Sequence, residues 1–285
     1  MDIEEREARR AALPAVLEYA FRPMFLAAGS WAALSLALWL AMFFGYVSLP
    51  TRLDPVSWHI HEMLFGFVMA AVAGFLLTAI PNWTGRLPVR GYRLAAFAGV
   101  WVMGRLACLS SANLPAWLAI LADIAFPATL LAVAAREIIV GRNWRNLPTT
   151  APLVLFVAAD LLMHLESLGT TVLPGLGWRL AAAAPVLLIA VIGGRIVPSF
   201  TRNWLSRQRA ARLPVPPNRF DTAAIAILAV ALALWVLLPE HVVSGVALTL
   251  AGFAHALRLG RWTGLATWPE KLLFILHVGY GWLAA

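Results

Sequence analysis

The sequence predicts an all-α fold, a polytopic transmembrane helical bundle of about eight to nine spans. Hydrophobic residues make up 61% of the chain and charged residues only 13%, which is typical of membrane proteins. Apolar runs of helical length recur along almost the whole chain, separated by proline, glycine, asparagine and arginine. These observations predict a single transmembrane helical domain over residues 21–285.

Nine candidate spans follow in order. Residues 1–20 mix acidic and basic side chains without an apolar core, so we expect a cytoplasmic lead-in rather than a cleavable signal peptide. Pro239 and Glu240 predict a tight turn between the seventh and eighth spans. The chain stops at Ala285, directly after the ninth. The spans lie near residues 24–47, 58–80, 92–111, 115–138, 148–168, 178–200, 221–239, 241–259 and 268–285.

The distribution of arginine predicts the topology. Arginines precede the first span and follow the second, fourth, sixth and eighth, whereas the alternate connections hold only Arg52 and Arg179. The positive-inside rule therefore places the N-terminus in the cytoplasm. The pI near 10.9 does not indicate nucleic acid as a partner, because the basic residues are spread over loops where membrane lipids with anionic headgroups are the expected neighbours.

Cysteine content limits the kinds of metal site. Cys108 is the one cysteine of the chain, which excludes an internal disulfide and a Cys-x-x-Cys-His haem attachment. A haem would therefore be held noncovalently by side chains such as histidine or methionine.

Histidines gather toward the predicted outer side of the membrane. His59 and His61 lie near the outer end of the second span and His164 near that of the fifth, whereas His277 lies near the midplane and His255 near the inner end of their spans. Ionisable groups inside a membrane are functional candidates, so we expect a metal or haem site. The alternative is that these histidines only hydrogen-bond to carbonyl groups. A sixth, His241, is expected to be a solvated corner residue.

Spacing restricts how two of these histidines act. On a regular helix, side chains two residues apart point about 200° away from each other, so His59 and His61 are expected to serve different cofactors, or one as ligand and one as its partner. Asp54 and Pro55 predict an N-cap and a regular first turn. Met63 shares a face with His59, and imidazole with thioether suits copper(I).

Other buried charges can be paired by depth. Arg105 and Asp123 lie at similar depth in consecutive spans and predict a structural ion pair. Asp160 precedes His164 by four residues, so its carboxylate can orient an imidazole that supports a metal-bound histidine. A competing interpretation makes these groups a proton relay in a transporter. Gly193 and Gly194 allow a close helix approach and lack the context of a phosphate loop.

Several segments together resemble one family. They run in order over nearly the whole chain and are similar to segments of the NnrS family, whose members are polytopic membrane proteins containing haem and copper and linked to denitrification and nitric oxide protection. The segments are Phe21–Phe25, Trp58–Gly66, Phe75–Gly85, Gly193–Thr201, His255–Trp262 and Leu276–Trp282.

The resemblance implies a haem- and copper-containing protein of the bacterial inner membrane with characteristic histidines at His59, His61, His255 and His277. Family members usually continue for several more helices and carry a further histidine motif, which this chain lacks, so we expect a shorter member. The adjacent histidine pair of the haem-copper oxidases and nitric oxide reductases is also missing.

We therefore expect haem b and copper, with nitric oxide as ligand. His59, His61 and His277 are the candidate ligands, and Met63 is a further candidate for copper. His255, with Arg258 and Arg261, is expected to hold a second haem through its propionates. No residue is assigned a catalytic role. The alternatives from other classes are a cofactor-free, proton-coupled transporter and an assembly protein that docks a respiratory complex.

Overall fold

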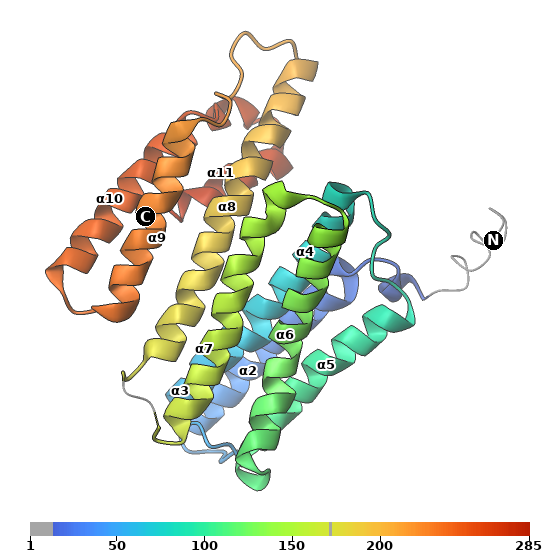
Figure 1. Ribbon diagram of the computed structural model, residues 1–285, viewed down its shortest axis with the longest axis vertical. Helices are drawn as coiled ribbons and strands as arrows, with labels where there is room; N and C mark the ends of the chain where they lie inside the picture. Colours follow the sequence, from blue (N-terminus) through green and yellow to red (C-terminus); the bar gives the residue numbers. More distant parts are fainter. Residues whose placement is uncertain (1–13, 171–172) are drawn as a thin grey trace. The chain divides into compact units, whose positions relative to one another are not determined.

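The chain is helical throughout the part that the computed structural model describes, residues 14–170 and 173–285. Figure 1 shows the helices in chain order, and no strand occurs among the described residues. The predicted all-α class is therefore confirmed. Most of the predicted lead-in, residues 1–13, lies outside the described residues; the 3₁₀ helix η1 (Ala15–Leu17) follows it.

Eight helical segments are long and apolar enough to cross a membrane, so this is a multi-pass membrane protein. The ninth candidate contains α11 (Lys271–Gly281), whose 11 residues span about 16 Å and fall short of the ~30 Å bilayer core. The eight segments are α2 (Phe21–Phe43), α3 (Pro55–His61) continuing through η2 (Glu62–Val68) and α4 (Met69–Thr84), α5 (Tyr92–Leu109), α6 (Ala116–Val140), η4 (Trp144–Thr150) with α7 (Ala151–Ser167), α8 (Leu176–Arg207), α9 (Arg219–Leu237) and α10 (Val242–Gly260).

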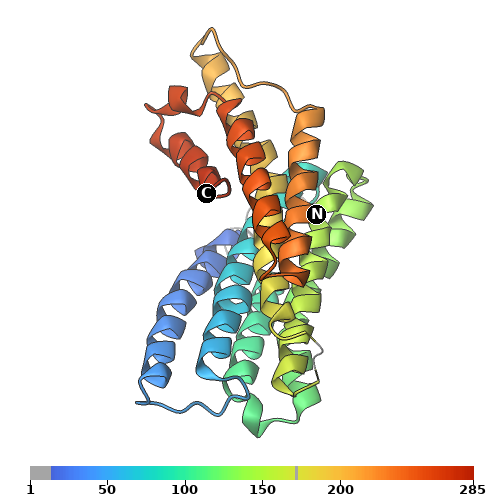
Figure 2. The ribbon, with the colours of Figure 1, turned by 90° about the vertical axis from the view of Figure 1, so that its left-hand side faces the viewer.

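The chain divides into two compact units, one ending at Ala181 and the other comprising Ala182–Ala285, with α8 contributing to both. In the first unit α2 packs on α4, α4 on α6, and α6 on both α5 and α7. In the second unit α9 and α10 form an antiparallel hairpin, and α11 packs against α10 (Figure 2). Each unit is described below by itself.

Side-chain caps set the starts of two helices. The Asp54 carboxylate accepts hydrogen bonds from the amides of Val56 and Ser57 at 3.0 and 3.1 Å, and Pro55 occupies the first helical turn of α3. Partial burial raises the pKa of Asp54, but hydrogen bonds from Ser57 and Val56 outweigh it and hold the pKa below its usual value. The predicted N-cap is therefore present. Asn218 caps α9 through a reciprocal box with Asp221.

The second span is not a regular helix. Directly after His61 the helix widens into the π-helix η2, a distortion that is rare and frequent at functional sites. At its centre Gly66 lies beneath Trp31, and its carbonyl accepts a hydrogen bond of 3.0 Å from Trp101 Nε1. The two indoles contact each other edge to face at 5.8 Å. The absence of a side chain at Gly66 thus lets α2 and α5 close on the π-helix.

We predict that Gly66→Ala destabilises the first unit. A Cβ at this position would lie 2.4 Å from the Trp31 indole, and such overpacking lowers the free energy of unfolding by about 1–3 kcal/mol. Thermal unfolding of the detergent-solubilised protein measures this. The matched control is Gly99→Ala on α5, where a Cβ meets nothing within 4 Å; equal losses in the two variants would contradict the packing argument.

Candidate functional site

A cluster of ionisable side chains lies buried in the first unit. Its members come from four helical segments, so the packing of α3 to α7 assembles it. His61 ends α3 and Glu62 begins the π-helix. All seven residues are at most 5% exposed: His61, Glu62, Arg105, Cys108, Asp123, Asp160 and His164.

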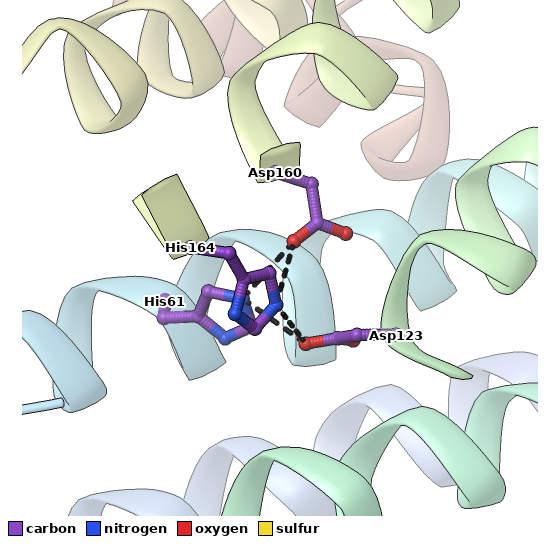
Figure 3. Close-up of side chains that lie close together, drawn as sticks. All are labelled: His61, Asp123, Asp160 and His164. Carbon is purple, nitrogen blue, oxygen red and sulfur yellow. Dashed lines mark hydrogen bonds and ion pairs between the residues drawn. The ribbon is translucent and has the colours of Figure 1, made fainter. Parts of the chain in front are cut away.

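The two imidazoles both face the same two carboxylates (Figure 3). His61 Nε2 lies 3.2 Å from Asp123 Oδ2 and 3.3 Å from Asp160 Oδ1. His164 Nε2 lies 3.1 Å from Asp123 Oδ2 and 3.5 Å from Asp160 Oδ1. Asp160 and His164 therefore meet on one face of α7, as their spacing predicts, and both also reach His61.

Arg105 ties the cluster together. Its guanidinium donates to Glu62 Oε2 at 2.7 Å and also hydrogen-bonds to Asp123 Oδ1, so the ion pair predicted with Asp123 is present and is extended to Glu62. Trp31 Nε1 donates to the same Glu62 oxygen at 2.7 Å. Because a single buried charge is expensive, this arginine stabilises two carboxylates at once.

The cluster nevertheless carries an excess of negative charge. Its three carboxylates and one guanidinium leave a formal charge of −2 when both imidazoles are neutral. His61 also has a carboxylate on each side, because its Nδ1 lies 3.2 Å from Glu62 Oε1, and a neutral ring has only one N–H to donate. Burial of this charge favours a cation, either protons or a metal ion.

The donor atoms are close enough to hold such an ion. Oxygen and nitrogen atoms of His61, Asp123, Asp160 and His164 all lie within 4.8 Å of one another, as do those of His61 and Glu62 with the Cys108 sulfur. Asp160 Oδ2 is buried without a hydrogen-bond partner, which is unusual for a carboxylate oxygen in a protein interior. The residues present therefore fit a metal ion.

Two residues of the predicted metal set lie elsewhere. His59 stacks on Trp39 with ring centroids 4.2 Å apart, and Met63 Sδ lies 3.9 Å from Ser35 Oγ. Both are two residues from His61, and the resulting turn of about 200° directs them away from its face. Of the proposed ligands His59, His61 and Met63, only His61 contributes to the cluster.

Cys108 joins the cluster although its sequence position predicts no role there, and Glu62, the carboxylate that follows His61 at the edge of the second span, joins it as well. Cys108 Sγ lies 3.5 Å from His61 Nδ1, and its position three residues after Arg105 could have revealed it, because residues at that spacing share a helix face. Glu62 depends on the π-helix, for which the sequence carries no comparable signal.

Two further histidines lie in the second unit. Thr201 Oγ1 lies 2.8 Å from His277 Nε2 and donates to the Val197 carbonyl at 2.8 Å. Since a hydroxyl has only one proton, it accepts from His277 Nε2–H and leaves Nδ1 as a bare lone pair. That Nδ1 is buried without a partner, and a Cβ at Gly264 would lie 2.5 Å from it, so Gly264 keeps the space beside this atom open.

His255 also has one partnered and one unpartnered ring nitrogen, but its partner hydroxyl can either donate or accept. Its Nδ1 lies 2.8 Å from the Tyr280 hydroxyl, while its Nε2 is buried without a partner. A ring nitrogen held by a hydrogen bond and the other left free is the arrangement of metal-ligating histidines. His241 differs, because it is exposed and caps α10 by accepting from the Val243 amide.

The basic residues beside these histidines have structural partners. Arg258 donates to Asp221 Oδ1 at 3.0 Å, to the Ala190 carbonyl at 2.9 Å and to the Tyr280 hydroxyl at 2.8 Å. Arg261 lies 3.3 Å from Asp221 Oδ2. Both arginines predicted to bind haem propionates are thus engaged by Asp221 in this structure, and Arg258 is buried.

The Gly193–Gly194 pair allows a close approach to α8, as expected, but the groups that approach it are side chains of other helices. A Cβ at Gly194 would lie 2.3 Å from the Arg258 guanidinium, and one at Gly193 would lie 3.2 Å from the Tyr280 ring. The two glycines therefore make room on α8 for the Arg258 and Tyr280 network.

The fold and these clusters define a multi-pass helical membrane protein with buried histidine sites suited to metal groups. The chain belongs to the NnrS family: the model of that family, described as NnrS protein, matches residues 15–285. Comparison with curated proteins and comparison with solved structures each gave no match.

We predict that Arg105→Gln strongly destabilises the first unit. It leaves Glu62 and Asp123 buried without their cation, and breaking a buried pair in this way costs roughly 3–5 kcal/mol. The control is Arg136→Gln, which removes an ion pair to Glu137 from a side chain that is 69% exposed and should cost less than about 1 kcal/mol. Thermal unfolding of both variants in detergent tests this, and a similar cost for the two would argue against a buried network.

Proposed function

We propose that this protein is a haem b and copper protein of the bacterial inner membrane that acts in the response to nitric oxide, with its N-terminus in the cytoplasm. Membership of the NnrS family supports the proposal, because the family resemblance implies both groups. The observation that carries it is the free ring nitrogen kept by three buried or half-buried histidines: His59 Nδ1, His255 Nε2 and His277 Nδ1.

His277 and His255 are the residues proposed to hold haem, each as a single ligand. Both have a ring fixed by a hydroxyl on one nitrogen and a free nitrogen on the other side, and such a fixed ring makes a better ligand. The single cysteine excludes the Cys-x-x-Cys-His attachment, so the haem is of the noncovalent b type. When bound, haem supplies an iron whose free or weakly held position captures the gas.

The buried cluster of the first unit is the proposed copper site. Imidazole is a copper ligand, and His61 and His164 supply two imidazoles beside Asp123 and Asp160. Cys108 belongs to a second group, with His61 and Glu62, at the other ring nitrogen of His61. Asp160 contributes a carboxylate oxygen that has no hydrogen-bond partner of its own, and Arg105 offsets part of the charge. Nitric oxide dissolves in lipid, so sites inside the membrane-spanning helices are reached by the gas directly.

The same cluster also fits a second candidate function, proton-coupled transport without a cofactor. Protons would neutralise its excess charge of −2 as well as a metal ion would. Buried acids with histidines form proton relays in transporters. Colour separates the two functions, because only the haem protein has a Soret band. The unpartnered nitrogens of His255 and His277 favour the haem protein, since a relay needs connected donors and acceptors.

We predict that His277→Ala and His255→Ala each lose haem. Loss of the group that hydrogen-bonds to a ligand weakens binding by ~10–100-fold. Loss of the ligand itself should weaken haem binding by at least as much. The measurement is the ratio of the Soret band to protein absorption after purification with adequate haem supply. His241→Ala, an exposed histidine on the same unit, is the control; an unchanged ratio in both test variants would place the haem elsewhere.

We predict that His61→Gln and Asp160→Asn each weaken copper binding by roughly tenfold or more. The measurement is the number of copper atoms per chain, determined by elemental mass spectrometry. Met63→Leu is the matched control, because Met63 lies beside Ser35 and outside the cluster. Loss of copper in Met63→Leu with retention in the other two variants would instead support a thioether site with His59.

A further inference from the structure

A large basic pocket lies in the first unit, and no histidine lines it. It has a volume of about 1020 Å³ and lies where α4 ends, α5 begins and the last turns of α6 pass by. Figure 1 shows the connection between α4 and α5 that forms one side of it. The pocket therefore opens at one end of the predicted membrane-spanning helices.

The rim of the pocket is strongly positive. It is lined by Arg86, Arg90, Arg93 and Arg136 against one carboxylate, Glu137, which leaves an excess of three positive charges. Glu137 pairs with Arg86 and with Arg136. No acidic partner is present among the described residues for Arg90 and Arg93. Arg93 Nε donates to the Tyr92 hydroxyl at 3.3 Å, which leaves the charge of both guanidiniums without a counter-ion.

The wall of the pocket is apolar. Leu77, Phe97, Val100 and Val133 line it from three helices, and its depth follows the direction of these membrane-spanning segments. A basic rim above an apolar wall matches a molecule with a charged headgroup and hydrocarbon chains. No histidine, cysteine or methionine lines the pocket, so the usual axial ligands of a haem are missing there.

We propose that this pocket binds an anionic phospholipid, with the phosphate at Arg90 and Arg93 and an acyl chain along the wall formed by α4, α5 and α6. Basic pockets between transmembrane helices are sites of this kind. The proposal does not depend on haem, on copper or on nitric oxide. The bound lipid fills a space that the helices leave open and holds the α4 to α5 connection against α6, beside the Arg86 to Glu137 pair.

The test compares two double variants of equal charge in the full-length protein. Arg90→Gln with Arg93→Gln removes the two guanidiniums of the pocket that have no acidic partner, whereas Arg207→Gln with Arg212→Gln removes two exposed arginines outside it. Native mass spectrometry in neutral detergent measures binding of phosphatidylglycerol, with phosphatidylcholine as the uncharged reference. We expect roughly 30-fold weaker phosphatidylglycerol binding in the pocket variant only, from about 1 kcal/mol per arginine at 1.4 kcal/mol per tenfold.

Three results would overturn the proposal. Equal weakening in both double variants would indicate diffuse attraction to the basic loops. Equal binding of phosphatidylcholine would remove the role of charge. Displacement of the lipid by an equal concentration of glycerol phosphate would indicate a small-anion site. Should the double variant fold poorly, the single Arg90→Gln variant must give the same direction of change, and wild-type binding there would also contradict the proposal.

Discussion

The bond network of Arg105 is the constraint on which the first unit depends. One guanidinium inside the membrane-spanning helices contacts Glu62 at the start of the π-helix and Asp123 on α6, and Asp123 in turn contacts both His61 and His164. A charge in such a place is tolerated only when its partners are fixed around it. The positions of α3, α5, α6 and α7 follow from that requirement, and so does the assembly of the histidine cluster.

Buried charges are paired differently in the two units. In the first, three carboxylates exceed the single arginine, and Asp160 Oδ2 has no partner, so the cluster could hold a cation, either protons or a metal ion. In the second, Arg258 and Arg261 share Asp221, and the nearby histidines lie on hydroxyl groups rather than on carboxylates. The first arrangement suits a metal ion, and the second keeps neutral imidazoles ready as ligands.

Much of this arrangement could be predicted from residue depth and helical spacing. The ion pair of Arg105 with Asp123 follows from their similar depth in adjacent spans, and the divergence of His59 from His61 follows from helical geometry. Asp221 was not predicted to pair with Arg258, although the start of one span and the end of the next meet at the open end of an antiparallel hairpin. Glu62 stands out in the sequence as a carboxylate beside two histidines at the edge of a span, but its contacts with Arg105 and Trp31 could not be predicted. They accompany the π-helix, where Trp31 packs over Gly66 and joins residues far apart in sequence.

The central claim is that these histidine sites hold haem in the membrane. It is tested most directly by the absorption spectrum of the detergent-purified wild-type protein, oxidised and reduced, with the pyridine haemochrome test and then addition of nitric oxide. We expect a b-type spectrum whose reduced Soret band shifts on addition of the gas. A colourless protein obtained under adequate haem supply would contradict it, and metal analysis would then decide whether the buried cluster of the first unit holds a metal ion or protons.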